Sequence, residues 1–189
     1  MKHPFFFGYG SLVNTGTHAF PEASPARLSG WRRVWRETDL RPAAFLSVEQ
    51  NEGSQIAGLI AAVPDGDWDA LDAREYAYER HIVTDHVHTG KLAEMSSVQI
   101  YATRPEISRD AGANHPILLS YLDVVVQGYL QQFGPKGVAD FFATTRGWST
   151  PILDDRSAPI YPRAQHLTSE EQACVDGWLK SLSAVVQDR

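Results

Sequence analysis

The stretch Phe5-Phe6-Phe7-Gly8-Tyr9-Gly10-Ser11-Leu12 joins an apolar segment to a turn that carries two glycines. Glycine adopts backbone angles that are closed to other residues, so Gly8 and Gly10 would allow a sharp turn after a buried strand. The backbone amides of Gly10, Ser11 and Leu12 could then point toward a carboxylate or a developing oxyanion. We therefore predict an anion-binding segment, which we call the 10–12 turn. A strand that simply ends in a glycine turn would have the same sequence.

A second segment, Leu71-Asp72-Ala73-Arg74-Glu75-Tyr76-Ala77-Tyr78, places a carboxylate among apolar residues. We predict a short helix here, opened by Asp65 or Asp67. One face of this helix would carry four residues at spacings of three and four: Trp68, Leu71, Glu75 and Tyr78. Desolvation raises the pKa of a carboxyl group from about 4.3 toward neutrality, where it becomes an efficient general base and acid. Glu75 is therefore the predicted catalytic residue. A surface glutamate neutralised by a neighbouring arginine is the alternative that the pattern leaves open.

The two motifs together resemble those of the γ-glutamylcyclotransferase-like superfamily, which includes γ-glutamylcyclotransferase, ChaC-type enzymes and AIG2-like proteins. Members carry a Y-G-S-L or Y-G-S-N turn after the first strand, and one essential glutamate in a segment such as L-D-x-R-E, followed by a tyrosine. The turn is matched by Tyr9, Gly10, Ser11 and Leu12, and the glutamate segment by Leu71, Asp72, Arg74, Glu75 and Tyr78. The resemblance covers roughly residues 5–145, and its weaker parts are Gly30-Trp31-Arg32-Arg33-Val34 and Val98-Gln99-Ile100-Tyr101-Ala102.

This resemblance implies an enzyme that converts a γ-glutamyl amino acid, peptide or amine to 5-oxoproline plus the free amine, acting on a C–N bond as a lyase or acyltransferase. It implies that Glu75 is the catalytic general acid and base, with substrate-binding residues Tyr9, Gly10, Ser11, Leu12, Tyr78 and Tyr101. It implies no cofactor and no metal, and a small γ-glutamyl substrate as the partner. The turn continues as Val13-Asn14, where ChaC-type enzymes usually have Ile-Trp, which argues against strict specificity for glutathione. The alternative is a non-catalytic AIG2-like module that binds a small carboxylated ligand.

Alternation and turn residues predict further strands over residues 5–9, 27–38, 81–88 and 97–103, and a hairpin that pairs residues 43–49 with 56–63 across Asn51-Glu52-Gly53. A helix is expected from near Asn114, with Pro116 in its first turn, to the residue before Gly134-Pro135; its inward residues would be Tyr121, Val125 and Tyr129. A capping box at Thr168-Ser169-Glu170-Glu171 predicts the last helix, with Val175, Trp178, Leu182 and Val185 on one face. Residues 150–165 are expected to form a loop.

Several strands with one intervening helix, followed by helices, predict an α+β fold. The resemblance implies a small mixed β-barrel-like sheet with flanking helices. With 189 residues, of which 43% are hydrophobic, the chain can bury one sizeable core. We find no repeat, low-complexity segment or linker, and therefore expect one γ-glutamylcyclotransferase-like domain over residues 1–189.

The net charge of -6 argues against a nucleic-acid partner, because such proteins usually carry a basic surface. Five arginines do cluster, but strand alternation is expected to leave them mostly solvated: Arg27, Arg32, Arg33, Arg36 and Arg41. A single cysteine excludes an internal disulfide, and no apolar run approaches the ~20 residues of a membrane span. The apolar run near the N-terminus, Phe5-Phe6-Phe7, is too short for the apolar region of a signal peptide. A cytoplasmic location is therefore expected. Neither the oligomeric state nor the leaving group of the substrate follows from the sequence.

Three other chemistries fit the residues less well. Ser11 lacks the flanking glycines of a G-x-S-x-G nucleophile elbow. The Gly8-Tyr9-Gly10 start has Val13 where a dinucleotide-binding loop needs its third glycine. A strand that carries His86 and His88 on one face is more often an exposed polar face than a metal site.

Overall fold

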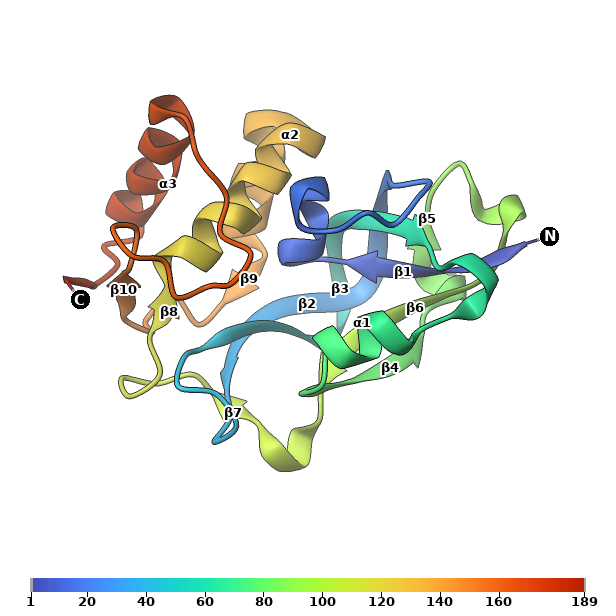
Figure 1. The fold of residues 1–189 in the computed structure, drawn as a ribbon, viewed down its shortest axis with the longest axis horizontal. Helices are drawn as coiled ribbons and strands as arrows, with labels where there is room; N and C mark the ends of the chain where they lie inside the picture. Colours follow the sequence, from blue (N-terminus) through green and yellow to red (C-terminus); the bar gives the residue numbers. More distant parts are fainter. Residues whose placement is uncertain (1, 189) are drawn as a thin grey trace.

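The computed structural model describes residues 2–188, and the chain folds around a mixed sheet with its first strand near the middle. Strand β1 (His3–Gly8) is apolar, and Phe5, Phe6 and Phe7 are all buried because both faces of this strand are covered. It pairs antiparallel with β3 (Phe45–Ala62) and parallel with β6 (Met95–Thr103). The sheet order is β4-β6-β1-β3-β2-β5, with β7 and β9 also paired to β2 (Figure 1).

The remaining strands of this sheet are β2 (Ser24–Glu37), β4 (Tyr78–Ile82), β5 (Val87–His88), β7 (Arg109–Asp110) and β9 (Thr145–Arg146). A second, parallel sheet consists of β8 (Ile117–Leu118), β10 (Ile152–Asp154) and β11 (Val186–Asp188). In the described part of the chain, six single-turn 3₁₀ helices connect the strands: η1 (Ser11–Val13), η2 (Thr15–Thr17), η3 (Pro64–Gly66), η4 (Thr84–His86), η5 (Leu92–Glu94) and η6 (Pro105–Ile107).

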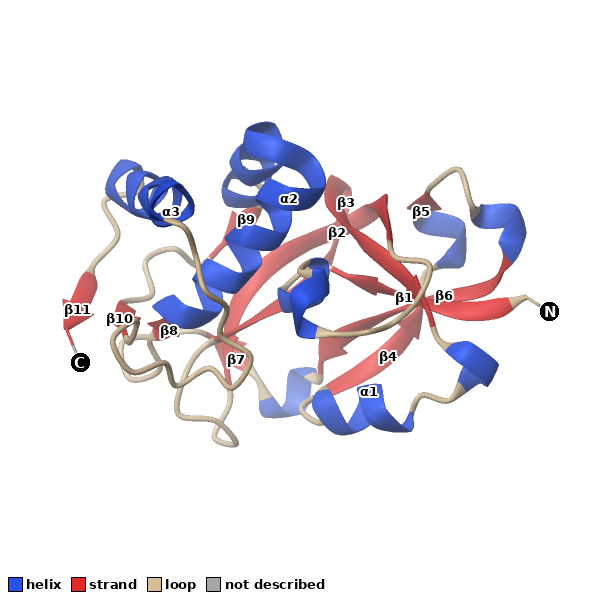
Figure 2. Ribbon diagram, turned by 45° about the horizontal axis from the view of Figure 1, so that its top comes forward, coloured by secondary structure: helices blue, strands red, loops and turns tan. Residues whose placement is uncertain are grey.

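Within residues 2–188 there are three α-helices. Helix α2 (Leu119–Ala143) and helix α3 (Ser169–Ser181) lie together at one end, whereas α1 (Asp69–Arg74) lies beside β4 and β6 (Figure 2). The larger core fills the space between the sheet and α2, and a smaller one under α1 includes Phe6 and Trp68. The mixed sheet forms a half-barrel, so the predicted α+β fold with a barrel-like mixed sheet is confirmed.

The predicted hairpin across Asn51-Glu52-Gly53 is wrong, because residues 45–62 form one long strand. Strand β2 pairs with β3 on both sides of the turn-like residues: Ser29 lies opposite Gln55, and Trp31 opposite Gln50. The four residues between Gln50 and Gln55 therefore bulge out. Gly53 does adopt the positive φ that a turn would require, at 81°. The chain nevertheless keeps its direction, because strand β2 pairs with β3 on both sides of the bulge.

The helix expected from near Asn114 to the residue before Gly134 is shifted toward the C-terminus. Its predicted first turn is strand β8, which pairs with β10, and the helix begins at Leu119. Gly134 has a φ of 66° and kinks the helix, but helical structure resumes and reaches Ala143. The predicted inward residues Val125 and Tyr129 are buried.

Three smaller predictions need correction. The expected strand over residues 81–88 is interrupted by η4, which holds His86, so His86 and His88 do not share a strand face. The capping box at Thr168 and Glu171 is confirmed, but α3 ends at Ser181 and Val185 is exposed beyond it. The expected loop over residues 150–165 contains β10.

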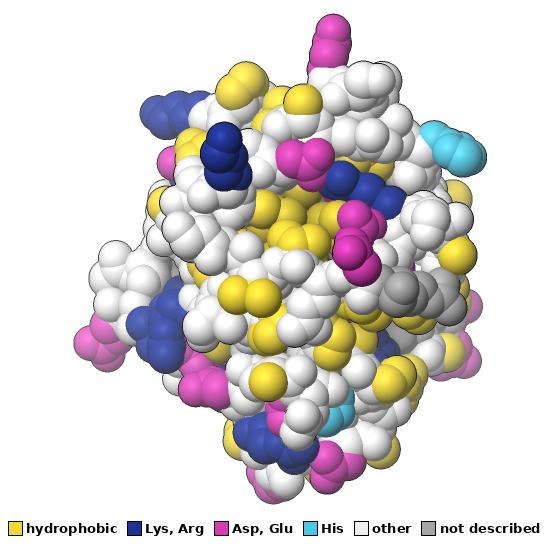
Figure 3. All heavy atoms as spheres, turned by 90° about the vertical axis from the view of Figure 1, so that its left-hand side faces the viewer, with side chains coloured by type: hydrophobic (Ala, Val, Ile, Leu, Met, Phe, Trp, Pro, Cys, Tyr) yellow, Lys and Arg dark blue, Asp and Glu magenta, His cyan; other side chains and the backbone are white. Residues whose placement is uncertain are grey.

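The side of the molecule that α3 and the small sheet occupy is shown in Figure 3. Acidic and basic side chains are interspersed there around exposed hydrophobic side chains. This face therefore has mixed charge, in keeping with the modest net charge of the chain. Within the described residues, no helix is long and apolar enough to cross a membrane.

Candidate active site

The 10–12 turn follows β1 directly and starts helix η1. Neither Gly8 nor Gly10 has a positive φ, and Gly10 has a φ of -115° and a ψ of -130°. A Cβ on Gly8 would lie 2.6 Å from the Cβ of Leu12, and one on Gly10 would lie 2.7 Å from the Tyr121 hydroxyl. Both glycines are therefore needed for space. They are required because the turn doubles back on itself and because a tyrosine occupies the adjacent space.

The amides of the turn are exposed to the site. The first backbone N–H groups of a helix have no partner within that helix. Among residues 2–188, the amides of Gly10 and Leu12 donate no hydrogen bond, whereas the next two amides along the chain bond back to Gly10 and Ser11. The turn therefore presents two of the three predicted backbone donors, those of Gly10 and Leu12, while the Ser11 amide interacts with the Tyr121 hydroxyl.

The turn is held on both sides. The Asn14 side chain donates to the Val124 carbonyl at 3.0 Å and to the Gln127 side chain at 2.9 Å, which ties η1 to α2. On the other side, the Tyr9 carbonyl accepts hydrogen bonds from Arg33 Nε at 3.3 Å and from the Tyr129 hydroxyl at 2.9 Å. The donors of this turn are therefore fixed before any ligand arrives.

Arg33 contradicts the expectation that the arginine cluster is solvated, because its side chain is fully buried. Its guanidinium donates to four neutral acceptors, namely the carbonyls of Tyr9 and Ala57 and the hydroxyls of Tyr129 and Thr144. It also lies 4.9 Å from the centre of the Tyr129 ring. Alternation places this residue on the inner face of β2, where these acceptors replace water.

Glu75 lies just after α1, where the helix gives way to strand β4. Its backbone N–H bonds to the Leu71 carbonyl, and its φ of -101° and ψ of 32° leave the helical region. The predicted single helical face is therefore wrong, because Tyr78 belongs to β4 and Trp68 packs against Tyr101 and Arg80 instead. The helix stops early because the residues that follow pair with β6.

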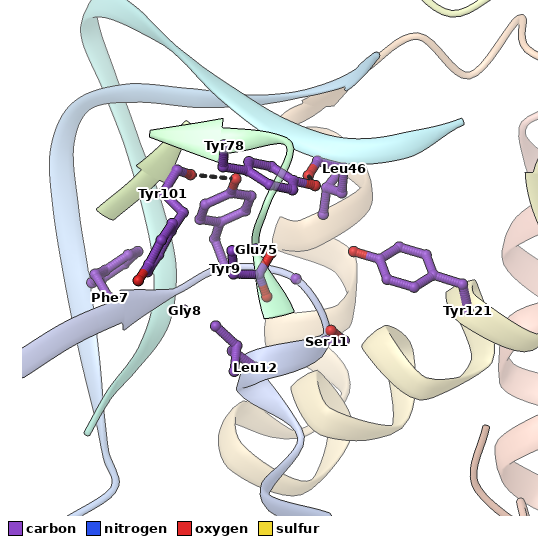
Figure 4. A pocket seen from close by; sticks show the side chains of 11 residues that line it. Phe7, Gly8, Tyr9, Ser11, Leu12, Leu46, Glu75, Tyr78, Tyr101 and Tyr121 are labelled. Carbon is purple, nitrogen blue, oxygen red and sulfur yellow. Dashed lines mark hydrogen bonds between the residues drawn. The ribbon is translucent and has the colours of Figure 1, made fainter. Parts of the chain in front are cut away.

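The carboxylate of Glu75 is nevertheless desolvated. Its side chain is 16% exposed and lies in the space between the 10–12 turn and several tyrosines (Figure 4). Burial raises the pKa of Glu75, while the guanidinium groups of Arg74, Arg41 and Arg163 act in the opposite direction. Arg74 Nε is 3.2 Å from a Glu75 oxygen. Both readings that the sequence left open thus hold in part, since Glu75 is buried and also has an arginine partner.

Three of the four tyrosines around Glu75 use their hydroxyls within the protein. Tyr9 donates to the Tyr101 carbonyl at 2.6 Å, and Tyr78 donates to the Leu46 carbonyl at 2.9 Å (Figure 4). Tyr101 donates to Asp72. These three predicted residues line the pocket as fixed walls. The Tyr121 hydroxyl has no such side-chain or carbonyl acceptor among residues 2–188, and burial raises its pKa, so it stays protonated and able to donate.

The site consists of a narrow inner pocket and a wide outer cleft. The inner pocket has ≈ 330 Å³ of space, counted with the open solvent at its mouth, and is lined by β1, the 10–12 turn, Glu75 and the four tyrosines. The outer cleft has ≈ 1030 Å³ of space on the same basis and shares four residues with it: Ser11, Glu75, Tyr78 and Tyr121. All seven predicted site residues line the inner pocket: Tyr9, Gly10, Ser11, Leu12, Glu75, Tyr78 and Tyr101.

The sequence did not identify Tyr121, Arg41 or Arg163 as site residues. Tyr121 is predicted only as an inward residue of its helix, and periodicity cannot tell a core tyrosine from one that faces a pocket. Arg41 and Arg163 lie in irregular segments that no pattern connects to Glu75. Within the described residues, no group of three or more His, Cys, Asp or Glu side chains could hold a metal ion.

The raised pKa of Glu75 predicts a pH-dependent stability. A carboxyl whose pKa is higher in the folded than in the unfolded chain binds more protons when folded, so the free energy of unfolding should fall as pH rises between the two values. Glu75→Gln removes this titration. We expect the variant to gain stability relative to the original protein from about pH 4 upward, with no further gain above the raised pKa. Urea unfolding of both proteins across this pH range measures the difference, and parallel curves would show that Glu75 is not desolvated.

A family model described as "Gamma-glutamyl cyclotransferase, AIG2-like" matches residues 6–121, more than half of the chain. No curated protein matches significantly.

Among solved structures, a gamma-glutamyl cyclotransferase is 16% identical with a TM-score of 0.58, and the match covers 93% of this chain and 99% of that one. An uncharacterized protein from Homo sapiens is 15% identical, with a TM-score of 0.56 and coverage of 91% and 97%. YkqA from Bacillus subtilis is 16% identical, with a TM-score of 0.58 and coverage of 74% and 52%. At these identities, the structural matches show a shared fold.

Proposed function

The chain belongs to the gamma-glutamyl cyclotransferase, AIG2-like family, and on this basis we propose that it converts a γ-glutamyl amino acid, peptide or amine to 5-oxoproline and the free amine. The observation that carries the proposal is the buried Glu75 carboxylate, which faces the free amides of the 10–12 turn within one pocket. A general acid and base beside a cluster of fixed donors is what an intramolecular acyl transfer requires.

The reaction is a ring closure within the substrate. The α-amine of the glutamyl group attacks its own γ-carbonyl carbon, so one C–N bond forms while the C–N bond to the leaving group breaks. Holding these two groups in contact can lower the activation barrier, by about 7 to 11 kcal/mol in the most favourable cases. The bonds change only by acyl transfer and proton transfer, so the reaction needs no cofactor.

Glu75 would move the proton between the two nitrogens. Its carboxylate takes a proton from the attacking amine and then donates it to the departing nitrogen, which is bonded to the same carbon. Burial supports this role because a raised pKa makes the carboxylate a stronger base toward the amine proton. A pKa closer to neutral pH also lets the same group accept the proton and return it. Arg74 keeps the carboxylate oriented through its contact at 3.2 Å.

The 10–12 turn would bind negative charge on the substrate. Its amides could hold the glutamyl α-carboxylate or the oxyanion that forms on the γ-carbonyl oxygen, and an oxyanion donor contributes about 3 to 4 kcal/mol. The Tyr121 hydroxyl lies next to Gly10 and could add a further donor. Tyr9, Tyr78 and Tyr101 would shape the pocket without taking part in proton transfer.

The test is to incubate the purified protein with γ-glutamyl amino acids, γ-glutamyl amines and glutathione, and to measure 5-oxoproline by chromatography. We expect release from at least one of these compounds. Calorimetry with the same compounds provides the control, because the non-catalytic AIG2-like alternative binds a ligand without converting it. Binding with no 5-oxoproline from any compound would contradict the proposed activity.

A further inference from the structure

The outer cleft beside Glu75 carries three arginine side chains on its walls: Arg41, Arg74 and Arg163. Arg74 is engaged by Glu75 and also donates to the Ser11 hydroxyl at 3.1 Å and to the Thr17 carbonyl at 3.0 Å. Arg41 and Arg163 differ, because neither lies within ion-pair distance of a carboxylate in residues 2–188, although both lower the pKa of Glu75 from further away. The cleft therefore has two guanidinium groups that can still bind an anion.

Arg41 is held in place by aromatic rings rather than by a carboxylate. Its guanidinium lies 4.6 Å from the centre of the Tyr76 ring and 5.7 Å from that of Phe45. Its Nε donates to the Tyr76 hydroxyl at 3.2 Å. This arrangement orients the guanidinium and leaves its terminal nitrogen donors for a ligand.

Arg163 belongs to the segment after β10, which lies outside the residues that the family model matches. The segment is anchored beside α2 by Asp155, whose buried carboxylate accepts hydrogen bonds from Ser120 N at 2.8 Å, Ser120 Oγ at 2.6 Å and Ile160 N at 2.8 Å. The Tyr161 ring packs edge-on against Tyr121, with 5.0 Å between ring centres. The segment that contains Arg163 is therefore fixed in position where it lines the cleft.

The rest of the cleft is largely apolar, with Phe45, Leu118, Ile160 and Pro162 among its lining residues. A γ-glutamyl group seated in the inner pocket would extend its leaving group into this cleft, because the two spaces meet at Glu75. We propose that Arg41 and Arg163 bind a free carboxylate on the leaving group, beside an apolar side chain. The preferred substrates are then γ-glutamyl derivatives of apolar amino acids rather than of simple amines. This inference rests on the proposed cyclotransferase activity.

Two substrates that differ only in that carboxylate test the inference: γ-glutamyl-phenylalanine and γ-glutamyl-phenethylamine. We expect the first to have a kcat/KM about tenfold to a hundredfold higher, the range for charge-assisted hydrogen bonds. Arg41→Gln and Arg163→Gln should each lower this preference severalfold, and Arg163→Lys should retain most of it because the charge remains. Arg27→Gln is the matched control, since Arg27 is exposed on β2 away from the cleft.

The outcomes separate the inference from the proposed function. Equal kcat/KM values for the two substrates would overturn the inference and leave the cyclotransferase activity standing. An equal loss on both substrates in the arginine variants would also overturn it, because the arginines would then bind the glutamyl α-carboxylate. If no γ-glutamyl amino acid, γ-glutamyl amine or glutathione gives 5-oxoproline, the proposed function fails. Calorimetry then still tests the carboxylate subsite, which predicts tighter binding of γ-glutamyl-phenylalanine than of γ-glutamyl-phenethylamine.

Discussion

Replacing Glu75 with glutamine should lower the rate of 5-oxoproline release by about 10²- to 10⁴-fold, the usual contribution of a general acid or base. The amide keeps the size of the side chain and can still accept a hydrogen bond from Arg74, so fold and substrate binding should survive. It cannot take up the proton of the attacking amine. The measurement is kcat from 5-oxoproline release, together with ligand binding by calorimetry and the unfolding midpoint of the variant.

Glu79→Gln is the matched control for this substitution. Glu79 lies on β4, pairs with His81 and lines a shallow pocket together with Asp72, outside the inner pocket. Asp72 accepts a hydrogen bond from Tyr101 and pairs with Arg80. The control should therefore retain nearly full activity. If Glu75→Gln retained comparable activity, Asp72 would have to be tested as the base.

Gly10→Val should abolish substrate capture and turnover. Its Cβ would lie 2.7 Å from the Tyr121 hydroxyl, and the two methyl groups would extend further into the inner pocket. Either the turn or Tyr121 must move, so we expect a loss in kcat/KM at least as large as the about 10²- to 10³-fold that follows removal of one oxyanion donor. Steady-state kinetics measures this loss, and the shift in unfolding temperature on adding substrate reports ligand capture separately.

Ser11→Ala separates the backbone of the turn from its side chain. The variant keeps the Ser11 amide and loses only the hydroxyl that accepts from Arg74 at 3.1 Å. Its effect should therefore be much milder than that of Gly10→Val. If the two variants lost activity equally, the Ser11 hydroxyl rather than the turn amides would hold the substrate.

Much of the site could be predicted from the sequence because the two motifs are local. Gly8 through Leu12 form one turn, and Leu71 through Tyr78 contain both the end of α1 and the start of β4. The side chains of both segments meet at the inner pocket. The reasons given for individual residues were less accurate, since Gly10 serves close packing and Glu75 is buried by tyrosines from other elements rather than by its own helical face.

The errors in the fold have a common physical origin in contacts between distant residues. The residues Asn51-Glu52-Gly53 form a bulge and not a hairpin turn, because β2 pairs with β3 on both sides of them. The start of α2 is set by Asp155, which accepts from the Ser120 amide across 35 positions in the sequence. Arg41 and Arg163 reach the cleft through the packing of separate segments. None of these partners can be read from local periodicity.

The buried Arg33 has a consequence for how the chain assembles. A guanidinium cannot shed its charge by losing a proton, so its enclosure is tolerable only when all of its acceptors are present. Those acceptors come from the end of β1, from β3, from the middle of α2 and from the residue that ends α2. A half-barrel that closed before α2 docked would trap a cation with part of its hydrogen bonds missing. Closure of the sheet and docking of the helix must therefore occur together, which makes their folding cooperative and gives early segments little stability of their own.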